Sequence, residues 1–425
     1  MNETVTFMHA ADLHLGAPFL GLRSYSDAWA RRMAAAIPEA FGRMIDTAIE
    51  KRVDFVVIAG DIFDLALPSF ADYACFLDGM ERLGAAGIPV YCCTGNHDPF
   101  ISWQQRYGKL PDNVFMFPAG DEAGYFLYER DGEPLVLLGG RGFSNQTWPQ
   151  GVDIAQGITR AAGEAVLGVN PPFAVGVLHT GLDIDASHAP TSPAGLMASG
   201  MDYWALGHVH IPLTWQDTTG NVRLSYSGCI QGRKIRDAGA RGVNIVTLSA
   251  GKPNELTYAP CASVVWEQVK IDVSACETLA EIVDAACGEL FRLNGEASCD
   301  EMVERVTLQG VTPLHELLQR PGVCEDIRAR INETCARFFC DVVLDETRAP
   351  HDINRMRAEG LFPAVFLDAC DRDGAESETA VTYLQQAFID AGMGVVDVSQ
   401  DALSRLQQNA EEFVLDLLDG KGGVS

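Results

Sequence analysis

The sequence predicts an α/β sandwich, followed by a smaller α+β module and a helical end. Over the first 260 residues, short apolar runs alternate with amphipathic segments of helical period. Several of the runs are β-branched and apolar throughout, as in strands that are buried on both faces. Near residues 259–262 the pattern changes to a second, smaller set of strands and helices. A length of 425 residues suits two or three such domains.

The first part is expected to contain eight strands and two clear helices. The strands are predicted at residues 5–9, 53–59, 88–93, 135–139, 173–178, 204–206, 222–226 and 243–248, and the helices at 31–51 and 71–86. The last two strands are expected to be more antiparallel than the others, because no helical segment separates them from their neighbours.

The second part is expected to be a small α+β module with a helical segment after it. Its strands are predicted at 264–273, 302–308 and 341–344, and its helices at 279–293, 314–320 and 325–336. Pro350 interrupts the pattern, and from residue 352 onward the chain is predicted to be helical, most clearly at 380–391 and 402–418.

The net charge is −27, which argues against a partner held by bulk attraction to a polyanion. The acidic excess is uneven, since residues 261–425 carry 31 acidic and 13 basic side chains. A nucleic-acid partner therefore requires a local basic patch or bound cations in the first part of the chain.

The twelve cysteines are scattered and form no CxxC pair. This usage favours a reduced, cytoplasmic chain. No apolar run approaches the roughly 20 residues that cross a bilayer, and the first eleven residues do not resemble a signal peptide. We therefore expect no membrane partner.

Five short polar motifs each follow a predicted strand. They are Asp12-Leu13-His14, Gly60-Asp61-Ile62-Phe63-Asp64, Gly95-Asn96-His97-Asp98, His179-Thr180-Gly181 and Gly207-His208-Val209-His210. Because the carboxyl ends of strands line the binding crevice of an open α/β sheet, the five motifs are expected to converge on one site.

The residue types in these motifs are those that hold a pair of divalent metals. Aspartate supplies carboxylate oxygen, histidine supplies nitrogen, and asparagine supplies a neutral carbonyl oxygen. Two metals about 3.5–4 Å apart stabilise both the attacking and the leaving oxygen of a phosphoryl displacement. The glycines at 60, 95 and 207 are expected to let the backbone turn sharply after each strand.

Each motif alone has an ordinary structural explanation, such as a helix cap, a turn or a packed histidine. Their occurrence together, in this order and always after a strand, favours a metal centre. Four other histidines have no assigned role. His9 is expected in the core or behind the site, and His188, His315 and His351 lie outside the motifs.

The five motifs in this order resemble the calcineurin-like metallophosphoesterase superfamily. The segments HAADLHLGAPF at 9–19, GDIFD at 60–64 and YSGCIQGRKIRDAGARG at 226–242 are similar to its SbcD/YhaO-like DNA repair exonuclease branch. The resemblance implies a four-layer α/β/β/α sandwich at 1–260, a capping α+β domain at 261–347, and a helical C-terminal region at 348–425.

The resemblance also implies a role for each motif residue. Asp12, His14 and His210 would hold one metal, and Asn96, His179 and His208 the other, with Asp61 bridging the two. His97 would face the scissile phosphate, and Asp64 would orient His97 by a hydrogen bond. The family implies two divalent ions, most simply Mn²⁺, that activate water for attack on phosphorus.

The main hypothesis is thus a metal-dependent DNA exonuclease or endonuclease that acts with an SbcC-like coiled-coil ATPase. No heptad stretch and no GxxxxGK[ST] loop occurs here, so the ATPase would be a separate chain that could bind residues 348–425. A homodimer is also compatible with the family. DNA contacts are expected from two basic groups, namely Arg223, Arg233, Lys234, Arg236 and Arg241, and Arg23, Arg31 and Arg32.

Two alternatives stay open from the sequence. One is a phosphatase or phosphodiesterase on non-DNA substrates, which the acidic composition mildly favours. The other is a non-catalytic binding module on the same fold, which the complete set of candidate ligands argues against.

Overall fold

The computed structural model describes residues 3–17, 26–65, 67–99, 109–185, 189–296, 299, 301–334, 337–351, 353–360, 362–372, 410–411 and 413–415. The chain divides into two compact units, which are treated separately below. The first comprises Met1–Gly310 and Leu317–Glu346, and the second comprises Val311–Glu316 and Thr347–Ser425. The first unit holds the sandwich together with the sheet of the capping module, and the domain limits expected at 260 and 347 stay predictions.

The first sheet has six strands in the order β12-β11-β1-β2-β3-β4. They are β1 (Thr4–Ala10), β2 (Phe55–Ala59), β3 (Val90–Cys93), β4 (Val114–Met116), β11 (Gly242–Ser249) and β12 (Glu255–Pro260). Strands β1 to β4 run parallel, so β1, β2 and β3 end at the same edge. β11 runs antiparallel to β1 and to β12, as its lack of a crossover helix predicted.

The second sheet also has six strands, in the order β5-β6-β7-β8-β10-β9. They are β5 (Gly124–Arg130), β6 (Glu133–Arg141), β7 (Phe173–His179), β8 (Tyr203–Gly207), β9 (Leu213–Gln216) and β10 (Val222–Tyr226). β7 and β8 are parallel neighbours and end side by side. β10 was expected to be antiparallel, but it pairs parallel with β8 and is antiparallel only to β9.

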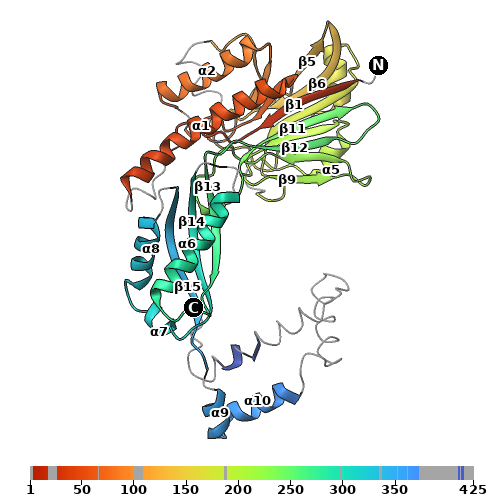
Figure 1. Ribbon diagram of the computed structural model, residues 1–425. Helices are drawn as coiled ribbons and strands as arrows, with labels where there is room; N and C mark the ends of the chain where they lie inside the picture. Colours follow the sequence, from red (N-terminus) through yellow and green to blue (C-terminus); the bar gives the residue numbers. More distant parts are fainter. Residues whose placement is uncertain are drawn as a thin grey trace. The chain divides into compact units, whose positions relative to one another are not determined.

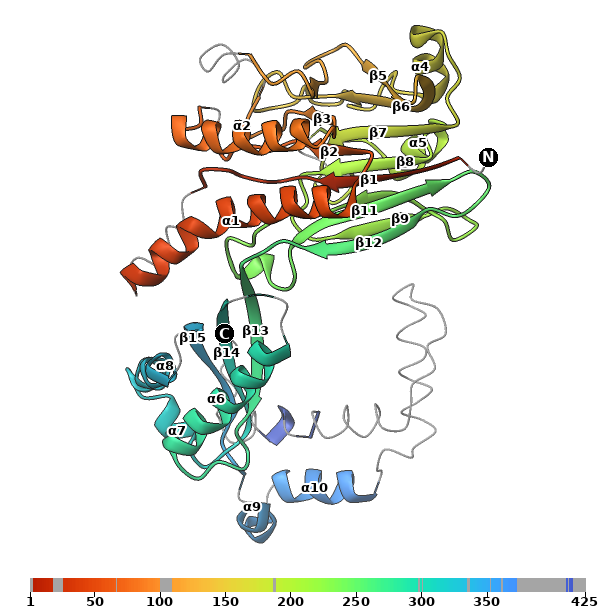
Figure 2. The same ribbon diagram turned by 45° about the horizontal axis from the view of Figure 1, so that its top comes forward.

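Helices cover the outer faces of both sheets, which gives the predicted α/β/β/α layers (Figures 1 and 2). α1 (Asp27–Lys51) and α2 (Phe70–Ala85) pack side by side over the first sheet. α4 (Arg160–Leu167) and α5 (Pro193–Ala198) pack against the second. Serine caps begin the two long helices: Ser26 Oγ accepts from the amide of Trp29, and Ser69 forms a capping box with Asp72.

The core between the two sheets is apolar and aromatic. Phe7 of β1 stacks on Phe55 of β2 at a centroid distance of 4.8 Å, and Tyr203 of β8 meets Phe7 edge-on at 5.7 Å. All three side chains are fully buried. Aromatic pairs of this kind add about 0.5–1.5 kcal/mol beyond their buried area. This packing holds the two sheets together. The polar motifs lie where the strands of both sheets end.

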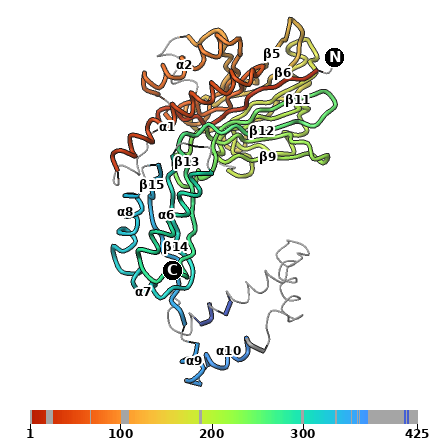
Figure 3. The backbone as a smooth tube through the Cα atoms, viewed as in Figure 1, coloured from red at the N-terminus to blue at the C-terminus, as the bar shows by residue number. Residues whose placement is uncertain are grey.

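After β12 the chain enters the capping module, as Figure 3 traces. Its sheet has the order β13-β14-β15, formed by β13 (Val264–Asp272), β14 (Glu301–Val311) and β15 (Phe338–Arg348). The helices are α6 (Leu279–Glu296), α7 (His315–Leu318) and α8 (Val323–Thr334). β13 and β14 are parallel and joined by α6. Trp266 of β13 packs with Met33 and Ala36 of α1, so this sheet is attached to the sandwich by an apolar contact.

In the second unit the described helices are α9 (Ile353–Glu359) and α10 (Phe362–Arg372). Met356 and Leu367 are buried together with Leu415. The helix predicted at 380–391 lies outside the described residues, and of 402–418 the structure describes only a few helical residues. Among all described helices, none is long and apolar enough to cross a membrane.

Among the α-helices and strands of the described residues, the sequence analysis missed β4, β5, β9, β12, α4 and α5. β4 has three residues, and β9 is a largely exposed edge strand without a continuous apolar run. α4 and α5 have eight and six residues, too few to show a helical period. These elements extend the sheets and cover them, but none of them carries a predicted site residue.

Candidate metal centre

The ends of five strands meet at one place. The loops after β1, β2 and β3 come from the first sheet, and those after β7 and β8 from the second. Backbone hydrogen bonds join them: the amide of Asp12 donates to Gly60 O at 3.1 Å, and that of His14 to Asp61 O at 3.0 Å. The amide of Thr180 donates to Gly207 O at 3.0 Å. The convergence expected from the sequence is therefore held by main-chain contacts between the motifs.

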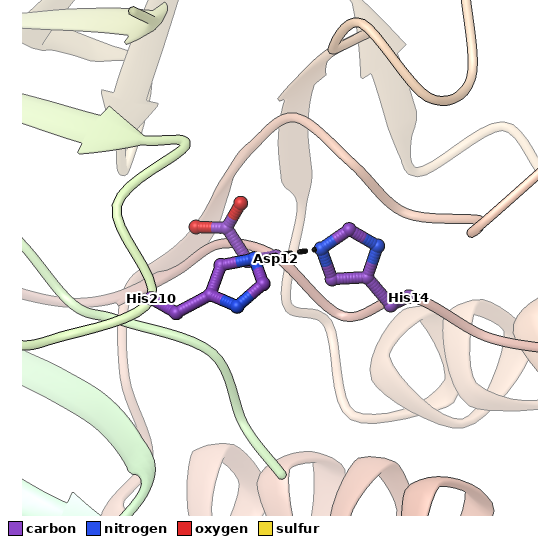
Figure 4. Close-up of side chains that lie close together, drawn as sticks. All are labelled: Asp12, His14 and His210. Carbon is purple, nitrogen blue, oxygen red and sulfur yellow. Dashed lines mark hydrogen bonds between the residues drawn. The ribbon is translucent and has the colours of Figure 1, made fainter. Parts of the chain in front are cut away.

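The first group of side chains contains Asp12, His14 and His210 (Figure 4). The Nε2 atoms of His14 and His210 face each other at 3.1 Å. The carboxylate of Asp12 accepts the amide of His208 with both oxygens, at 3.1 and 3.0 Å. One potential ligand atom from each of the three lies within 4.8 Å of the others.

The second group contains Asn96, His179 and His208. Oδ1 of Asn96 lies 3.0 Å from Nε2 of His179 and 3.3 Å from Nδ1 of His208. Asp61 lies between the two groups, because its Oδ2 is 3.4 Å from Nε2 of His179 and 3.8 Å from Nε2 of His14. The six other predicted metal-binding side chains therefore form two groups, and Asp61 contacts one histidine of each.

The outer nitrogens of the imidazoles fix which nitrogen faces inward. Nδ1 of His179 donates to Ala59 O at 3.0 Å, and Nδ1 of His210 lies 3.4 Å from Oδ1 of Asp237. Nδ1 of His14 lies 3.1 Å from a carboxylate oxygen of Asp64. With the proton on Nδ1, the Nε2 lone pairs of these imidazoles point into the site. Two lone pairs that face each other at 3.1 Å repel unless a cation lies between them, so the residues fit a metal.

The surroundings favour neutral imidazoles at His14 and His208 and an ionised carboxylate at Asp61. At His210 burial would lower the pKa, but the hydrogen bond with Asp237 outweighs it and raises the pKa. Burial lowers the pKa of His14 to about 4, although Asp64 and Asp61 oppose the shift. Burial, and then the charge of His179, lowers the pKa of His208. Burial alone would raise the pKa of Asp61, but the histidines around it outweigh this effect and lower it. Metal ions bind neutral imidazole and carboxylate, so the directions at His14, His208 and Asp61 suit a metal centre.

Backbone strain is concentrated here. Asp12, His14 and Asp61 have φ of 51°, 47° and 50°, and His208 has φ of 107°. Such values cost a non-glycine residue of order 1–3 kcal/mol, and they persist only where the surroundings impose them. They are half of the eight non-glycine residues with positive φ in the described part of the chain.

Two motif glycines, Gly95 and Gly207, leave no room for a side chain. A Cβ on Gly95 would lie 2.1 Å from Oδ1 of Asp61, and one on Gly207 would lie 1.9 Å from Ala59 O. Neither has positive φ. Gly60 does turn, with φ of 84°. The glycines allow the strands to bring the motifs within contact distance.

His97 lies beside the two groups and is 40 % exposed, so it can reach a bound substrate. The predicted hydrogen bond to the Asp64 carboxylate is not seen, because Nδ1 of His97 instead donates to the main-chain oxygen of Asp64 at 2.9 Å. The carboxylate is 3.7 Å away and contacts His14 and Arg233. These neighbours explain why the pKa of Asp64 falls to about 2 even though burial opposes the shift.

Asp98 is a residue that the sequence analysis quoted but gave no role. It is fully buried. Its carboxylate accepts from the amides of Ile62 at 2.8 Å, Phe63 at 3.2 Å and Gly95 at 2.8 Å. It thereby joins the loops after β2 and β3. The only signal for this role in the sequence is an aspartate at the end of the third motif.

Two further acidic residues orient histidines and were not predicted. Asp237 contacts Nδ1 of His210, and Oδ2 of Asp185 lies 3.3 Å from Nε2 of His208. Both lie outside the five motifs, so spacing could not reveal them. Asp237 does fall within the segment 226–242, which was singled out for its resemblance.

The histidines without a predicted role are placed as follows. His9 is buried between the sheets, where Nδ1 accepts from the hydroxyl of Tyr203 and Nε2 donates to Leu206 O. Burial lowers its pKa to about 3. His315 and His351 belong to the second unit, and His188 lies outside the described residues.

The calcineurin-like phosphoesterase family matches residues 5–212, which include every residue of both groups. Residues 5–212 form a calcineurin-like phosphoesterase domain. The middle domain of the metallophosphoesterase YhaO matches residues 266–348, the capping module. The family and the clustered donors together indicate a metal-dependent phosphoesterase that uses divalent ions.

The phosphoesterase has relatives in bacteria and archaea. It is 29% identical to the uncharacterized metallophosphoesterase YhaO of Bacillus subtilis over 87% of this chain and 88% of that protein. It is 26% identical to the DNA double-strand break repair protein Mre11 of Thermoplasma acidophilum over 58% of this chain and 62% of that one. Both agree with the SbcD/YhaO-like branch. A dimetal phosphatase from Danio rerio aligns at 14% identity and a TM-score of 0.35, over 60% of this chain and 100% of that one.

Proposed function

We propose that the phosphoesterase is a two-metal phosphodiester hydrolase that cuts DNA. The observation that carries the two-metal part is the position of Asp61. Its Oδ2 lies 3.4 Å from His179 and 3.8 Å from His14, one residue from each group. A carboxylate oxygen between two sets of inward-facing donors suits a ligand shared by two cations.

In this proposal each group holds one divalent ion. Asp12, His14 and His210 bind the first, and Asn96, His179 and His208 bind the second, with Asp61 shared. The donors are carboxylate, imidazole and amide oxygen, a mixture that suits Mn²⁺ and similar ions. When bound, the pair of ions supplies Lewis-acid activation of water and of the phosphate.

In this proposal the side chain of His97 transfers the proton to the leaving group. Because Nδ1 of His97 donates to Asp64 O at 2.9 Å, the ring is held with Nε2 directed away from Asp64. The exposed ring can then donate a proton from Nε2 to the leaving oxygen. The carboxylate of Asp64, 3.7 Å from Nδ1, stabilises the charged imidazolium that this step requires.

DNA as the substrate is supported by the relatives, several of which carry the name DNA double-strand break repair protein Mre11. Two of the basic residues expected to contact DNA, Lys234 and Arg236, are exposed. Others have internal partners: Arg223 donates to Asp202 O, and the buried Arg241 donates to Ala238 O. Arg32 pairs with Glu39 and Glu301, and Arg31 is exposed on α1. We assign phosphate contacts to Lys234 and Arg236, the exposed residues that follow the fifth motif in the sequence. Arg23 lies outside the described residues.

A separate SbcC-like ATPase and the use of Mn²⁺ in the cell belong to the same proposal. The ATPase is supported by the resemblance and by α10, where Phe362 and Val365 are 65 % and 58 % exposed. Apolar side chains on an exposed helix suit a helical partner.

The proposal is tested by comparing two substrates under one set of conditions. Purified chain with Mn²⁺ is expected to degrade linear duplex DNA, and chelation with EDTA should stop it. His97→Ala should lower the rate by about 10²–10⁴-fold, the range for loss of a general acid. Gel assays of labelled DNA measure both effects, and His315→Ala, a histidine of the second unit, serves as the matched control.

Other results of these assays would contradict a specific part of the proposal. Hydrolysis of a small aryl phosphodiester with no action on DNA would contradict the DNA substrate and favour the non-DNA phosphodiesterase. Full DNA cleavage by His97→Ala would contradict the proton donor. Absence of hydrolysis of either substrate with Mn²⁺ would favour the non-catalytic module.

A further inference from the structure

The segment Gln231–Gly239 contacts both the metal centre and the capping module, in addition to carrying the exposed Lys234 and Arg236. It follows β10 and contains the short 3-10 helix η2 (Ile235–Asp237). Of its residues, Gln231 and Asp237 are 2 % exposed. Buried polar side chains in a loop require partners, and the partners here lie on both sides of the segment.

On the side that faces the metal centre, the segment supports the Nδ1 atoms of His14 and His210, the two histidines of the first group. The guanidinium of Arg233 pairs with Oδ1 of Asp64, and Oδ1 of Asp64 is 3.1 Å from Nδ1 of His14. Oδ1 of Asp237 is 3.4 Å from Nδ1 of His210. The two imidazoles whose Nε2 atoms face each other are thus both supported from the same turn.

The two supports are also linked to each other. The amide of Arg233 donates to Oδ2 of Asp237 at 3.0 Å. A continuous ring of contacts therefore runs from His14 through Asp64, Arg233 and Asp237 to His210. The turn therefore contacts the supports of both imidazoles.

On its outer side the segment is fastened to β13, the first strand of the capping module. Nε1 of Trp266 donates to Gly232 O at 3.2 Å, and the amide of Gly239 donates to Trp266 O at 2.8 Å. Nε2 of Gln231 donates to Val264 O at 2.6 Å, and the amide of Ser263 donates back to Oε1 of Gln231 at 3.1 Å. One tryptophan therefore holds both ends of the turn.

The second group has different supports. His179 is fixed by Ala59 O in β2, and His208 contacts Asp185. Neither support involves residues 231–239 or the capping module. We therefore expect changes in residues 231–239 to alter the affinity of the first metal site and not that of the second.

We propose that residues 231–239 are a positioning segment through which the capping module sets the affinity of the first metal site. Arg233 and Asp237 align His14 and His210, and Trp266 holds the segment that carries them. The capping module is then part of the metal centre rather than an independent appendage. This inference rests on the two-metal site proposed above.

The test is a calorimetric titration of the metal-free chain with Mn²⁺. The wild-type chain is expected to bind two ions. Arg233→Ala and Asp237→Ala should each weaken one site by about 10–100-fold, the range for loss of a residue that orients a ligand, while the other site stays within about 3-fold. Arg233→Lys should restore part of the affinity, because it keeps the charge beside Asp64.

Trp266→Phe tests the link to the capping module. It removes the Nε1–H donor to Gly232 and one of the two fused rings but keeps an aromatic side chain in β13, and it should weaken the same site. Lys252→Ala is the matched control, since Lys252 is an exposed basic residue of the same unit and lies outside residues 231–239.

The outcomes separate this inference from the proposed function. A wild-type chain that binds fewer than two Mn²⁺ contradicts the proposed function and the inference together. Two ions bound with unchanged affinities in Arg233→Ala and Trp266→Phe overturn the inference alone. Equal weakening of both sites in Arg233→Ala and Asp237→Ala also overturns it, because a general structural defect would act on both.

Discussion

Asp61→Asn is expected to lower the rate of phosphodiester hydrolysis by about 10³-fold or more, equivalent to about 4 kcal/mol of transition-state stabilisation. Asp61 Oδ2 lies between the two groups of donors, and Oδ1 accepts the amide of His97 at 2.9 Å. Asparagine keeps the size of the side chain but removes its charge. Its NH₂ group can neither bind a metal nor accept the amide of His97, so either the shared ligand or this hydrogen bond is lost whichever way the amide turns. Single-turnover assays with excess Mn²⁺ measure the change.

Asp112→Asn is the matched control, because Asp112 is exposed and pairs only with Lys109 among the contacts described for it. The rate of this variant should equal that of the wild-type chain. An Asp61→Asn chain with more than a tenth of the wild-type rate would show that Asp61 is not the shared ligand.

Asp98→Ala is expected to cause the largest loss of stability near the site. The substitution leaves three buried amides, those of Ile62, Phe63 and Gly95, without their acceptor. A buried donor left unpaired costs about 1–3 kcal/mol, so we expect a loss of about 3–5 kcal/mol in the free energy of unfolding. The loops that carry Asp61 and Asn96 would separate as a consequence, and metal binding would weaken.

Thermal unfolding in EDTA measures this effect without a contribution from bound metal. Asp98→Asn should be intermediate, because its single oxygen still accepts but its nitrogen does not. Asp78→Ala, an exposed position on α2, provides the control. Equal melting temperatures for Asp98→Ala and wild type would show that the carboxylate does not hold the two loops together.

The layers of the sandwich could be predicted because their strands are continuous apolar runs. β2 and β7 are buried at every position, and a segment of this kind is recognisable without its neighbours. Edge strands such as β9 could not be predicted, because their exposed side chains follow no pattern. The place of the site follows from the strands that were visible, since the polar motifs come directly after them.

The contacts behind the candidate ligands could not be read from the sequence. Arg233 reaches Asp64 across 169 residues, and Asp237 reaches His210 across 27. Nothing in the spacing of these residues encodes either pair, which exists only because the sheets bring the loops together. The family resemblance implied a hydrogen bond from the Asp64 carboxylate to His97. In the structure the carboxylate contacts His14 and Arg233, and His97 donates to the main-chain oxygen of Asp64.

The most direct measurement of the central claim is a crystal structure of the chain soaked with Mn²⁺, with anomalous difference density collected near the manganese edge. The account predicts two peaks about 3.5–4 Å apart, with a carboxylate oxygen of Asp61 between them. Asp12, His14 and His210 should contact one peak, and Asn96, His179 and His208 the other. A single peak, or two peaks that do not share Asp61, would contradict the two-metal centre.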